Sequence, residues 1–209
     1  MQVPLLVRPA TLRNLWDDTL GTAAGHSAPY HDRIGRRRSA SLPHVSEFDY
    51  LTPYVVIAAV EQSYDVSLDG TMLAYPSYVN RVYGVTSEDR VGYIAKFYRP
   101  GRWTDEAIQE EHAFVNACNA RELPVVAPLS SVDEDTLSVV VAESDGGEQE
   151  YRFALYPKRG GRNFDAERDE DWLRLGRLVG RVHTVATGVE ASHRVVCTPS
   201  ESTAGFVEE

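Results

Sequence analysis

The chain is poor in cysteine and has no long apolar run. Its 209 residues include two cysteines, Cys118 and Cys197, whose spacing fits neither a zinc motif nor a disulfide framework. No segment approaches the roughly 18 consecutive apolar residues of a membrane-spanning helix. The first residues, Met1 to Val7, lack the basic start and apolar core of a secretory signal. These absences argue against a disulfide-stapled secreted domain and a membrane partner, and we expect a cytoplasmic location.

Basic residues are also scarce. The chain has 21 lysines and arginines against 31 aspartates and glutamates, which gives a net charge of −10. Because nucleic-acid binding needs a basic face that neutralises phosphates, this balance argues against a nucleic-acid partner. Hydrophobic residues at 43% and charged residues at 25% are ordinary for a globular protein. The length allows one domain or one and a half.

Residues 1–46 differ from the rest of the chain. They contain Gly21–Gly25 and the basic run Arg36–Ser39, and no helical or strand period persists through them. We therefore predict a disordered N-terminal arm over residues 1–46.

From residue 47 onward, apolar periodicity predicts three helices and five strands. Pro53 can open the first helix, Thr104 caps the second, and the third runs from about Asp169 to Ala186. The strands are expected at Val66–Tyr75, Tyr78–Val85, Val91–Tyr98, Leu137–Ala142 and Tyr151–Tyr156. Because short turns join antiparallel strands, the order predicts an α+β fold: a five-stranded antiparallel sheet with one inserted helix, followed by a single long helix.

One charged pair suggests chemistry. Lys96 is the one cation in the strand Val91–Tyr98, and fifteen residues later Glu111 lies on the apolar face of a predicted helix. A carboxylate there is costly unless it is paired, and Lys96 is a plausible partner. A strand lysine held by a helical glutamate is how kinase-type nucleotide lobes bind ATP phosphates. The alternatives are a surface lysine, a Glu111 side chain that reaches water, and Glu110 as the pairing carboxylate.

Two further segments fit a nucleotide site. Ser77 and Asn80, just before and at the start of the second predicted strand, could donate hydrogen bonds to phosphates in place of a glycine-rich loop. An ordinary polar turn is the alternative. The stretch Phe153–Gly161 would be a hinge: an apolar strand end followed by an extended linker, with Tyr156 before Pro157 biased to extended geometry, offers backbone donors and acceptors to adenine. An ordinary strand end is the alternative here.

The remaining histidines and acidic residues give no catalytic site. His193–Val195 lacks the aspartate of a His-x-Asp catalytic loop, and His183 has no nucleophile at a recognisable spacing. Asp169–Asp171 is typical of the acidic first turn of a helix rather than of a metal site. We therefore assign no catalytic and no metal-binding residue.

Several blocks of the chain carry specific residue patterns. They are Ser77–Tyr83, Ala95–Thr104, Glu110–His112, Leu123–Pro128, Gly160–Phe164 and Leu175–His183. Together they resemble the bacterial stress response kinase A family, Ser/Thr protein kinases with the choline-kinase and aminoglycoside-phosphotransferase fold. The resemblance runs from about Phe48 to His193. The block around Lys96 is specific to this family, whereas the last block is shared across the wider phosphotransferase group.

The resemblance implies a kinase-like nucleotide-binding N-terminal lobe over residues 47–157. Residues 158–209 would supply a hinge, the first helix of the C-terminal lobe and a polar tail. The residues that it implies for ATP binding are Ser77, Asn80, Lys96, Glu111, Pro157 and Arg159. The family's His-Gly-Asp motif and its Asn and Asp magnesium ligands have no match here. We therefore expect a truncated kinase, whose cofactors are ATP and Mg²⁺ and which is inactive alone.

The function that we expect is therefore an ATP-dependent Ser/Thr protein kinase of the stress response type, with ATP and a protein substrate as partners. One alternative is a small-molecule phosphotransferase that acts on an amino alcohol or an aminoglycoside. The other is a non-catalytic module, whose apolar helix face over Trp172–Ala186 would meet a partner.

Overall fold

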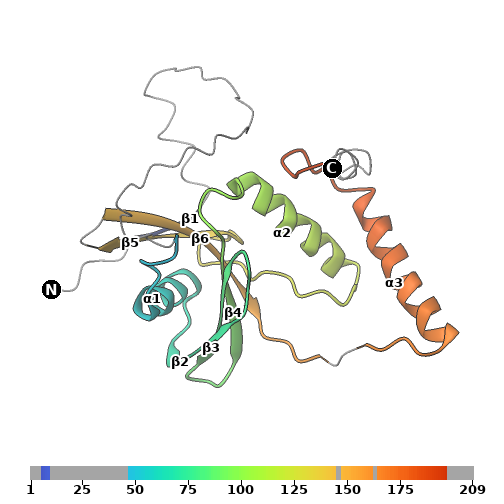
Figure 1. Ribbon diagram of the computed structural model, residues 1–209, viewed down its shortest axis with the longest axis horizontal. Coiled ribbons are helices and arrows are strands. Elements are labelled where there is room, and N and C mark those ends of the chain that lie inside the picture. Colours follow the sequence, from blue (N-terminus) through green and yellow to red (C-terminus); the bar gives the residue numbers. More distant parts are fainter. Residues whose placement is uncertain (1–5, 10–46, 145–146, 162–163, 197–209) are drawn as a thin grey trace, which may run out of the picture.

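The computed structural model of the protein describes residues 6–9, 47–144, 147–161 and 164–196 (Figure 1). In these ranges, three α-helices pack around one six-stranded sheet. The helices are α1 (Pro53–Tyr64), α2 (Asp105–Ala120) and α3 (Asp169–Ala186). The strands are β1 (Leu6–Pro9), β2 (Leu68–Tyr75), β3 (Arg81–Ser87), β4 (Gly92–Phe97), β5 (Ser138–Ser144) and β6 (Gly147–Pro157).

The sheet is antiparallel throughout, in the order β1-β5-β6-β4-β3-β2. The predicted α+β fold is confirmed: strands β2 to β6 form a five-stranded antiparallel sheet with α2 inserted after β4. β1 is a sixth strand, which pairs with β5 and departs from the prediction of an unstructured arm. Four residues are too few to show a reliable period. The rest of that prediction, over residues 1–5 and 10–46, lies outside the described residues.

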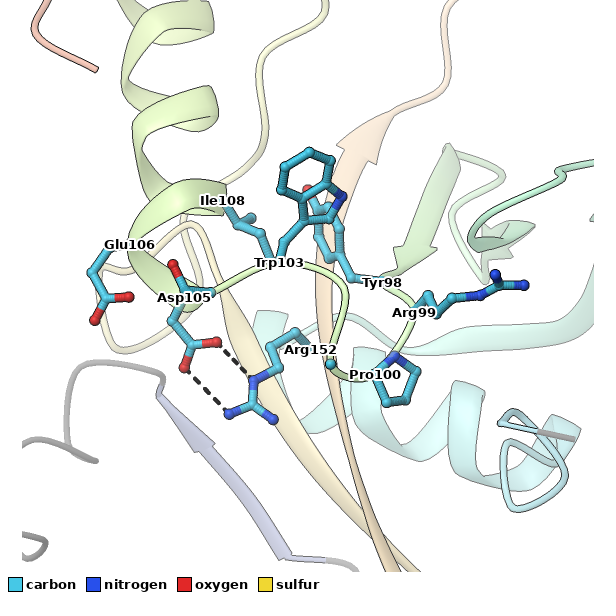
Figure 2. A pocket seen from close by; sticks show the side chains of 10 residues that line it. Tyr98, Arg99, Pro100, Trp103, Asp105, Glu106, Ile108 and Arg152 are labelled. Atoms are coloured by element: carbon cyan, nitrogen blue, oxygen red, sulfur yellow. Dashed lines mark hydrogen bonds and ion pairs between the residues drawn. The ribbon is translucent and has the colours of Figure 1, made fainter. Parts of the chain in front are cut away.

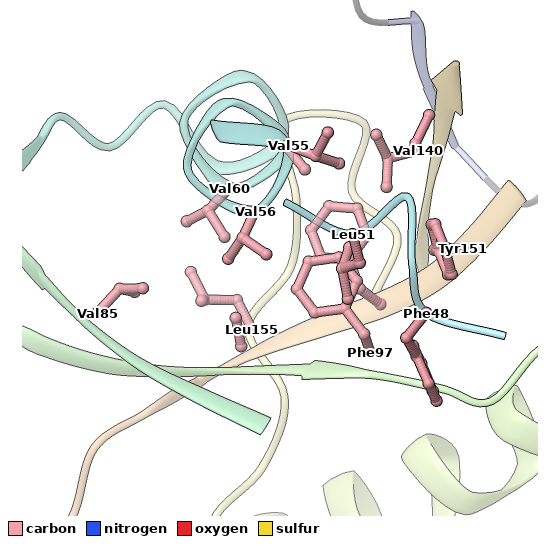
Figure 3. Close-up of a cluster of buried hydrophobic side chains, with 14 of the residues drawn as sticks. Phe48, Leu51, Val55, Val56, Val60, Val85, Phe97, Val140, Tyr151 and Leu155 are labelled. Carbon is pink, nitrogen blue, oxygen red and sulfur yellow. The ribbon is translucent and has the colours of Figure 1, made fainter. Parts of the chain in front are cut away.

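The two faces of the sheet carry different helices (Figure 1). α1 covers one face, and the core between them includes Val56, Val60, Phe97, Phe153 and Leu155 (Figure 3). The rings of Phe97 and Phe153 stack with their centroids 5.0 Å apart. This core fixes β4 against β6, so the residues that alternate with Phe97 along β4 must face the other side.

α2 covers the opposite face. The side chain of Thr104 caps it by accepting the N–H of Ala107 at 3.2 Å, and Ile108 packs against Leu137 and Ala154 of the sheet region. α3 then packs on α2 through Cys118, Leu123 and Val185. α2 therefore lies between the sheet and α3 (Figure 1).

Two local features complete the fold. β3 begins at Arg81 rather than at Tyr78, because residues 78–80 form a bend. Trp172 and Leu173 of α3 leave 60% and 59% of their surface exposed.

Among the helices in the described parts of the chain, none has the length and apolar character of a membrane span.

The stacked pair of phenylalanines gives a test of the core. Replacing Phe97, which is fully buried, by alanine should lower the free energy of unfolding by about 3–5 kcal/mol, since transfer and cavity terms add. Urea unfolding followed by circular dichroism measures the change. Val132→Ala, at a 56% exposed position, is the control and should change it by about 0.5 kcal/mol or less. A loss below about 1 kcal/mol for Phe97→Ala would contradict the packing described.

Candidate functional site

Lys96 projects from the face of the sheet that α2 covers. It pairs in register with Val82 of β3 and Ala154 of β6, whereas its neighbours Ala95 and Phe97 are buried on the α1 side. The Lys96 side chain keeps 24% of its surface exposed. The strand alternation that buries Phe97 therefore also aims Lys96 at α2.

Glu111 of α2 meets Lys96 there. Lys96 Nζ lies 3.2 Å from Glu111 Oε1 and 4.4 Å from the centroid of the Tyr98 ring. The Glu111 side chain keeps 33% of its surface exposed, although helical spacing places it between the buried Ala107 and Ile108 of α2. Glu110 instead pairs with His193, at 2.9 Å from His193 Nδ1. Of the two glutamates, Glu111 is thus the partner of Lys96.

The buried polar group of α2 is His112, next to Glu111. His112 Nε2 lies 2.9 Å from Tyr98 Oη and 3.2 Å from Tyr156 Oη, and His112 Nδ1 lies 2.9 Å from Thr136 Oγ1. The two tyrosine oxygens are 3.3 Å apart. A neutral ring satisfies this network if Tyr98 donates to Nε2, Tyr156 donates to the Tyr98 oxygen, and Nδ1–H donates to Thr136. The network ties α2 to the end of β4 and to β6.

Burial sets the charge of this network. It lowers the pKa of His112 to about 4; nearby Glu111 and Asp135 oppose the shift, and Lys96 adds to it. Burial also raises the pKa of Tyr98, and it raises that of Tyr156 to about 12. The imidazole is therefore neutral and both hydroxyls are protonated near pH 7.

A second anchor holds the start of α2. Arg152 of β6 donates from Nε to Asp105 Oδ1 at 2.7 Å and from Nη2 to Asp105 Oδ2 at 3.4 Å. The pair borders a cavity of about 310 Å³ between the turn after β4 and the first turn of α2 (Figure 2). Lys96 and Glu111 do not line this cavity. Because Arg152 occupies both oxygens of Asp105, we assign the pair to positioning the helix.

The predicted phosphate loop lies beside the end of β4. Ser77 Oγ accepts the backbone N–H of Asn80 at 3.3 Å, and Asn80 Oδ1 accepts the backbone N–H of Arg99 at 3.3 Å. Asn80 thus ties the loop to the chain three residues after Lys96, and its amide nitrogen is left as the donor. Tyr78 at the tip of the loop is 94% exposed. Ser77 and Asn80 are therefore near the Lys96 end of the sheet.

The predicted hinge lies at the other end of β4. Pro157 pairs in register with Tyr93, and the backbone N–H of Lys158 donates to Gly92 O at 3.0 Å. Arg159 follows and is exposed. Gly92 and Lys96 are four positions apart on one face of β4, which corresponds to about 13 Å along a strand. The hinge and the lysine thus bracket one stretch of the sheet.

An apolar, partly open surface connects these two ends. Register pairing places Tyr75, Val82 and Ile94 on the same sheet face as Lys96, and all three are half-buried. Gly84 lies among them, where an added Cβ would approach Tyr75 Cε2 to 2.9 Å. The Tyr75 ring therefore rests directly on the Gly84 backbone. A flat apolar surface of this kind suits an aromatic base.

Sequence reasoning missed two groups of residues at the site. Arg194, whose Nη1 lies 3.1 Å from Glu111 Oε2, was set aside with His193 for want of an aspartate. It lies 83 positions from Glu111, and no local pattern signals such a contact. His112 and its tyrosines were also missed, although a histidine beside an apolar stripe was a usable signal. In the described ranges, no group of three or more His, Cys, Asp or Glu could hold a metal ion.

Comparison with known proteins identifies relatives. The phosphotransferase enzyme family (APH) matches residues 73–201, more than half of the chain. Stress response kinase A of Escherichia coli strain K12 is 35% identical over 136 residues, and so is the serine/threonine protein kinase RdoA of Salmonella typhimurium strain LT2. Each alignment covers 65% of this chain and 38% of the relative. The chain therefore spans about two fifths of the length of these curated relatives.

Solved structures share the fold. Amicoumacin kinase hAmiN, in complex with AMP-PNP, Ca²⁺ and Ami, has a TM-score of 0.53 at 20% identity, over 66% of this chain and 41% of that one. A microcompartment-associated aminopropanol kinase has a TM-score of 0.51 at 18% identity, over 70% and 45%. The kinase-like fold and the family resemblance stated from the sequence are thus confirmed.

The buried imidazole predicts a pH dependence of stability. The pKa of His112 is depressed in the folded state, so its contribution is fully present above about pH 6.5 and is lost as pH falls towards 4. The loss should reach about 3 kcal/mol at the acid end. Urea unfolding at stepped pH values measures the free energy of unfolding for wild type and for His112→Gln. The difference between the two pH profiles is the contribution of His112, because the variant lacks the imidazole. His183→Gln, at an exposed position, is the control. Parallel pH profiles for wild type and His112→Gln would refute the assignment.

Proposed function

We propose, from the premise that this chain belongs to the phosphotransferase enzyme family, that it binds ATP as the nucleotide-binding part of a Ser/Thr protein kinase. The observation that carries the proposal is the partly exposed Lys96–Glu111 ion pair at 3.2 Å, on the face of the sheet that α2 covers. A cation held by one carboxylate and still partly exposed can contact a second anion. In kinases, that anion is the phosphate chain of ATP.

The phosphates would lie between Lys96 and the Ser77–Asn80 turn. Lys96 would bind the α- and β-phosphates, and Glu111 would keep the ammonium in place. The Ser77 hydroxyl and the Asn80 amide would donate from the covering turn, which Asn80 already fixes through the N–H of Arg99. Charge-assisted hydrogen bonds of this kind are the stronger ones in proteins.

The base would lie towards the hinge. Tyr75, Val82 and Ile94 would give it an apolar surface, and backbone groups near Pro157 and Arg159 would meet its polar edge. The spacing of the hinge and Lys96 along β4 supports this placement, because it separates a base site from a phosphate site along one extended ligand.

The proposal for this chain is limited to nucleotide binding. Phosphoryl transfer needs Mg²⁺ and a positioned acceptor in addition to a phosphate clamp. The residues described include no cluster of carboxylates and histidines for a metal. The relative named as a serine/threonine protein kinase supports a protein as the acceptor of the full-length enzyme.

Removing the ammonium of Lys96 should weaken ATP binding and leave adenosine binding unchanged. Loss of a charged hydrogen bond of about 1.5–3 kcal/mol corresponds to about 10- to 100-fold in affinity for ATP with Lys96→Met. Isothermal titration calorimetry with ATP and with adenosine gives the ratio of the two dissociation constants, which is the contribution of the phosphates.

The matched control is Arg174→Met, which removes a positive charge at an exposed position of α3. It should leave the phosphate contribution as in wild type. Equal loss of the contribution in both variants would mean that general charge, and not the Lys96 site, attracts ATP. Wild-type protein that binds ATP no better than adenosine would refute the proposal.

The base surface is tested separately. Tyr75→Ala should weaken adenosine and ATP by the same factor, about 5- to 30-fold, because aromatic contacts to a base contribute about 1–2 kcal/mol. The same titrations measure it, and the ratio between the two ligands should not change. A change in the ratio, with adenosine affinity intact, would place Tyr75 at the phosphates instead.

A further inference from the structure

The carboxylate of Glu111 is held from two sides. Lys96 Nζ lies 3.2 Å from Oε1, and Arg194 Nη1 donates to Oε2 at 3.1 Å. Lys96 comes from β4, whereas Arg194 comes from the segment after α3. Because each oxygen has its own cation, the carboxylate cannot rotate without losing one of them.

Arg194 is itself fixed in place. Its Nη1 also donates to the carbonyl of Ala107 at 3.3 Å, and its guanidinium carbon lies 4.8 Å from the centroid of the Trp103 ring. Stacking on an indole together with two hydrogen bonds defines the plane of an arginine far better than one ion pair does. Arg194 thus spans the first turns of α2, from Trp103 just before the cap to Glu111.

The backbone that leads to Arg194 is anchored to the same helix. Glu110 Oε1 accepts the N–H of Ser192 at 2.8 Å and that of His193 at 3.0 Å, and it lies 2.9 Å from His193 Nδ1. Two consecutive carboxylates of α2 therefore hold three consecutive residues, 192–194. This contact is separate from the apolar packing of α3 on α2, which involves Cys118 and Val185.

We propose that Arg194 is a positioning residue for the phosphate site: it fixes the orientation of Glu111, and through Glu111 that of Lys96, so that the segment after α3 is coupled to nucleotide binding. The inference rests on the proposed function. A partly exposed ion pair such as Arg194–Glu111 adds little to the stability of the fold. We therefore expect Arg194 to affect mainly the orientation of the Glu111 carboxylate. Without Arg194, Glu111 Oε2 loses its protein donor and the carboxylate turns towards solvent. The flexible Lys96 side chain then samples more rotamers, which phosphate binding must restrict.

The test is the affinity of Arg194→Gln for ATP and for adenosine. We expect about a tenfold loss in the phosphate contribution, the ratio of the two dissociation constants, with adenosine affinity unchanged. Arg194→Lys keeps a cation near Glu111 and should recover part of the loss. Arg174→Gln, an exposed arginine of α3, removes the same charge elsewhere and should have no effect.

A double-mutant cycle connects the effect to Lys96. In a Lys96→Met background, Arg194→Gln should leave the ratio unchanged, because the group that it positions is gone. An Arg194→Gln protein with the wild-type ratio, or with tighter ATP binding, would overturn the inference. A wild-type protein without any preference for ATP over adenosine would instead overturn the proposed function.

A second measurement needs no nucleotide. The chain has two lysines, so in protein labelled with lysine carrying ¹³C at Cε, the Lys158→Arg variant identifies the Lys96 signal. The two Hε protons of an immobilised Lys96 should have distinct chemical shifts, and they should merge in Arg194→Gln. Distinct shifts that persist in Arg194→Gln would show that Lys96 is held without Arg194 and would overturn the inference.

Discussion

The placement of α2 against β4 is the constraint on which the site depends. Three contacts set it: the Arg152–Asp105 pair at the first turn, the packing of Ile108 against Leu137 and Ala154, and the buried His112 with Tyr98 and Tyr156 in the middle of the helix. Since His112 must face the tyrosines, its neighbour Glu111 is turned about 100° around the helix axis. That rotation directs the carboxylate to the ammonium of Lys96.

The same arrangement explains why the ion pair is suited to binding rather than to stability. A fully buried pair would have no capacity for a ligand and would carry a large desolvation cost. Here both partners remain partly exposed, at 24% and 33% of their side chains, while their directions are set by neighbours that are buried. The rigid part of the site is thus the apolar and neutral polar network behind it, and the charged groups stand at its surface.

Much of this could be predicted from the sequence. The strand that carries Lys96, the cap at Thr104 and the spacing of Lys96 and Glu111 each follow from local rules, and the structure contains the pair that they predicted. The exact facing of α2 did not follow. Helical spacing places Glu111 on the apolar face of α2, between the buried Ala107 and Ile108, yet a third of its side chain stays exposed beside Lys96. The fully buried polar side chain is its neighbour His112, whose ring nitrogens find partners just after β4, on β6 and in Thr136. Arg194 was missed because its contact with Glu111 depends on the tertiary docking of the segment after α3. β1 was missed because its four residues are too few to show a strand period, and its partner β5 lies far along the chain.

The most direct measurement uses the scarcity of lysine. Lys96 and Lys158 are the two lysines of the chain, so an ATP analogue whose terminal phosphate is an acyl anhydride, which acylates a nearby amine, can be mapped to one site by peptide mass spectrometry. The account predicts modification of Lys96, prevented by excess ATP and prevented less effectively by the same concentration of adenosine, which shares only the base surface. Modification of Lys158 alone, or modification of Lys96 that ATP does not prevent, would contradict the claim that Lys96 contacts the phosphates of a bound nucleotide.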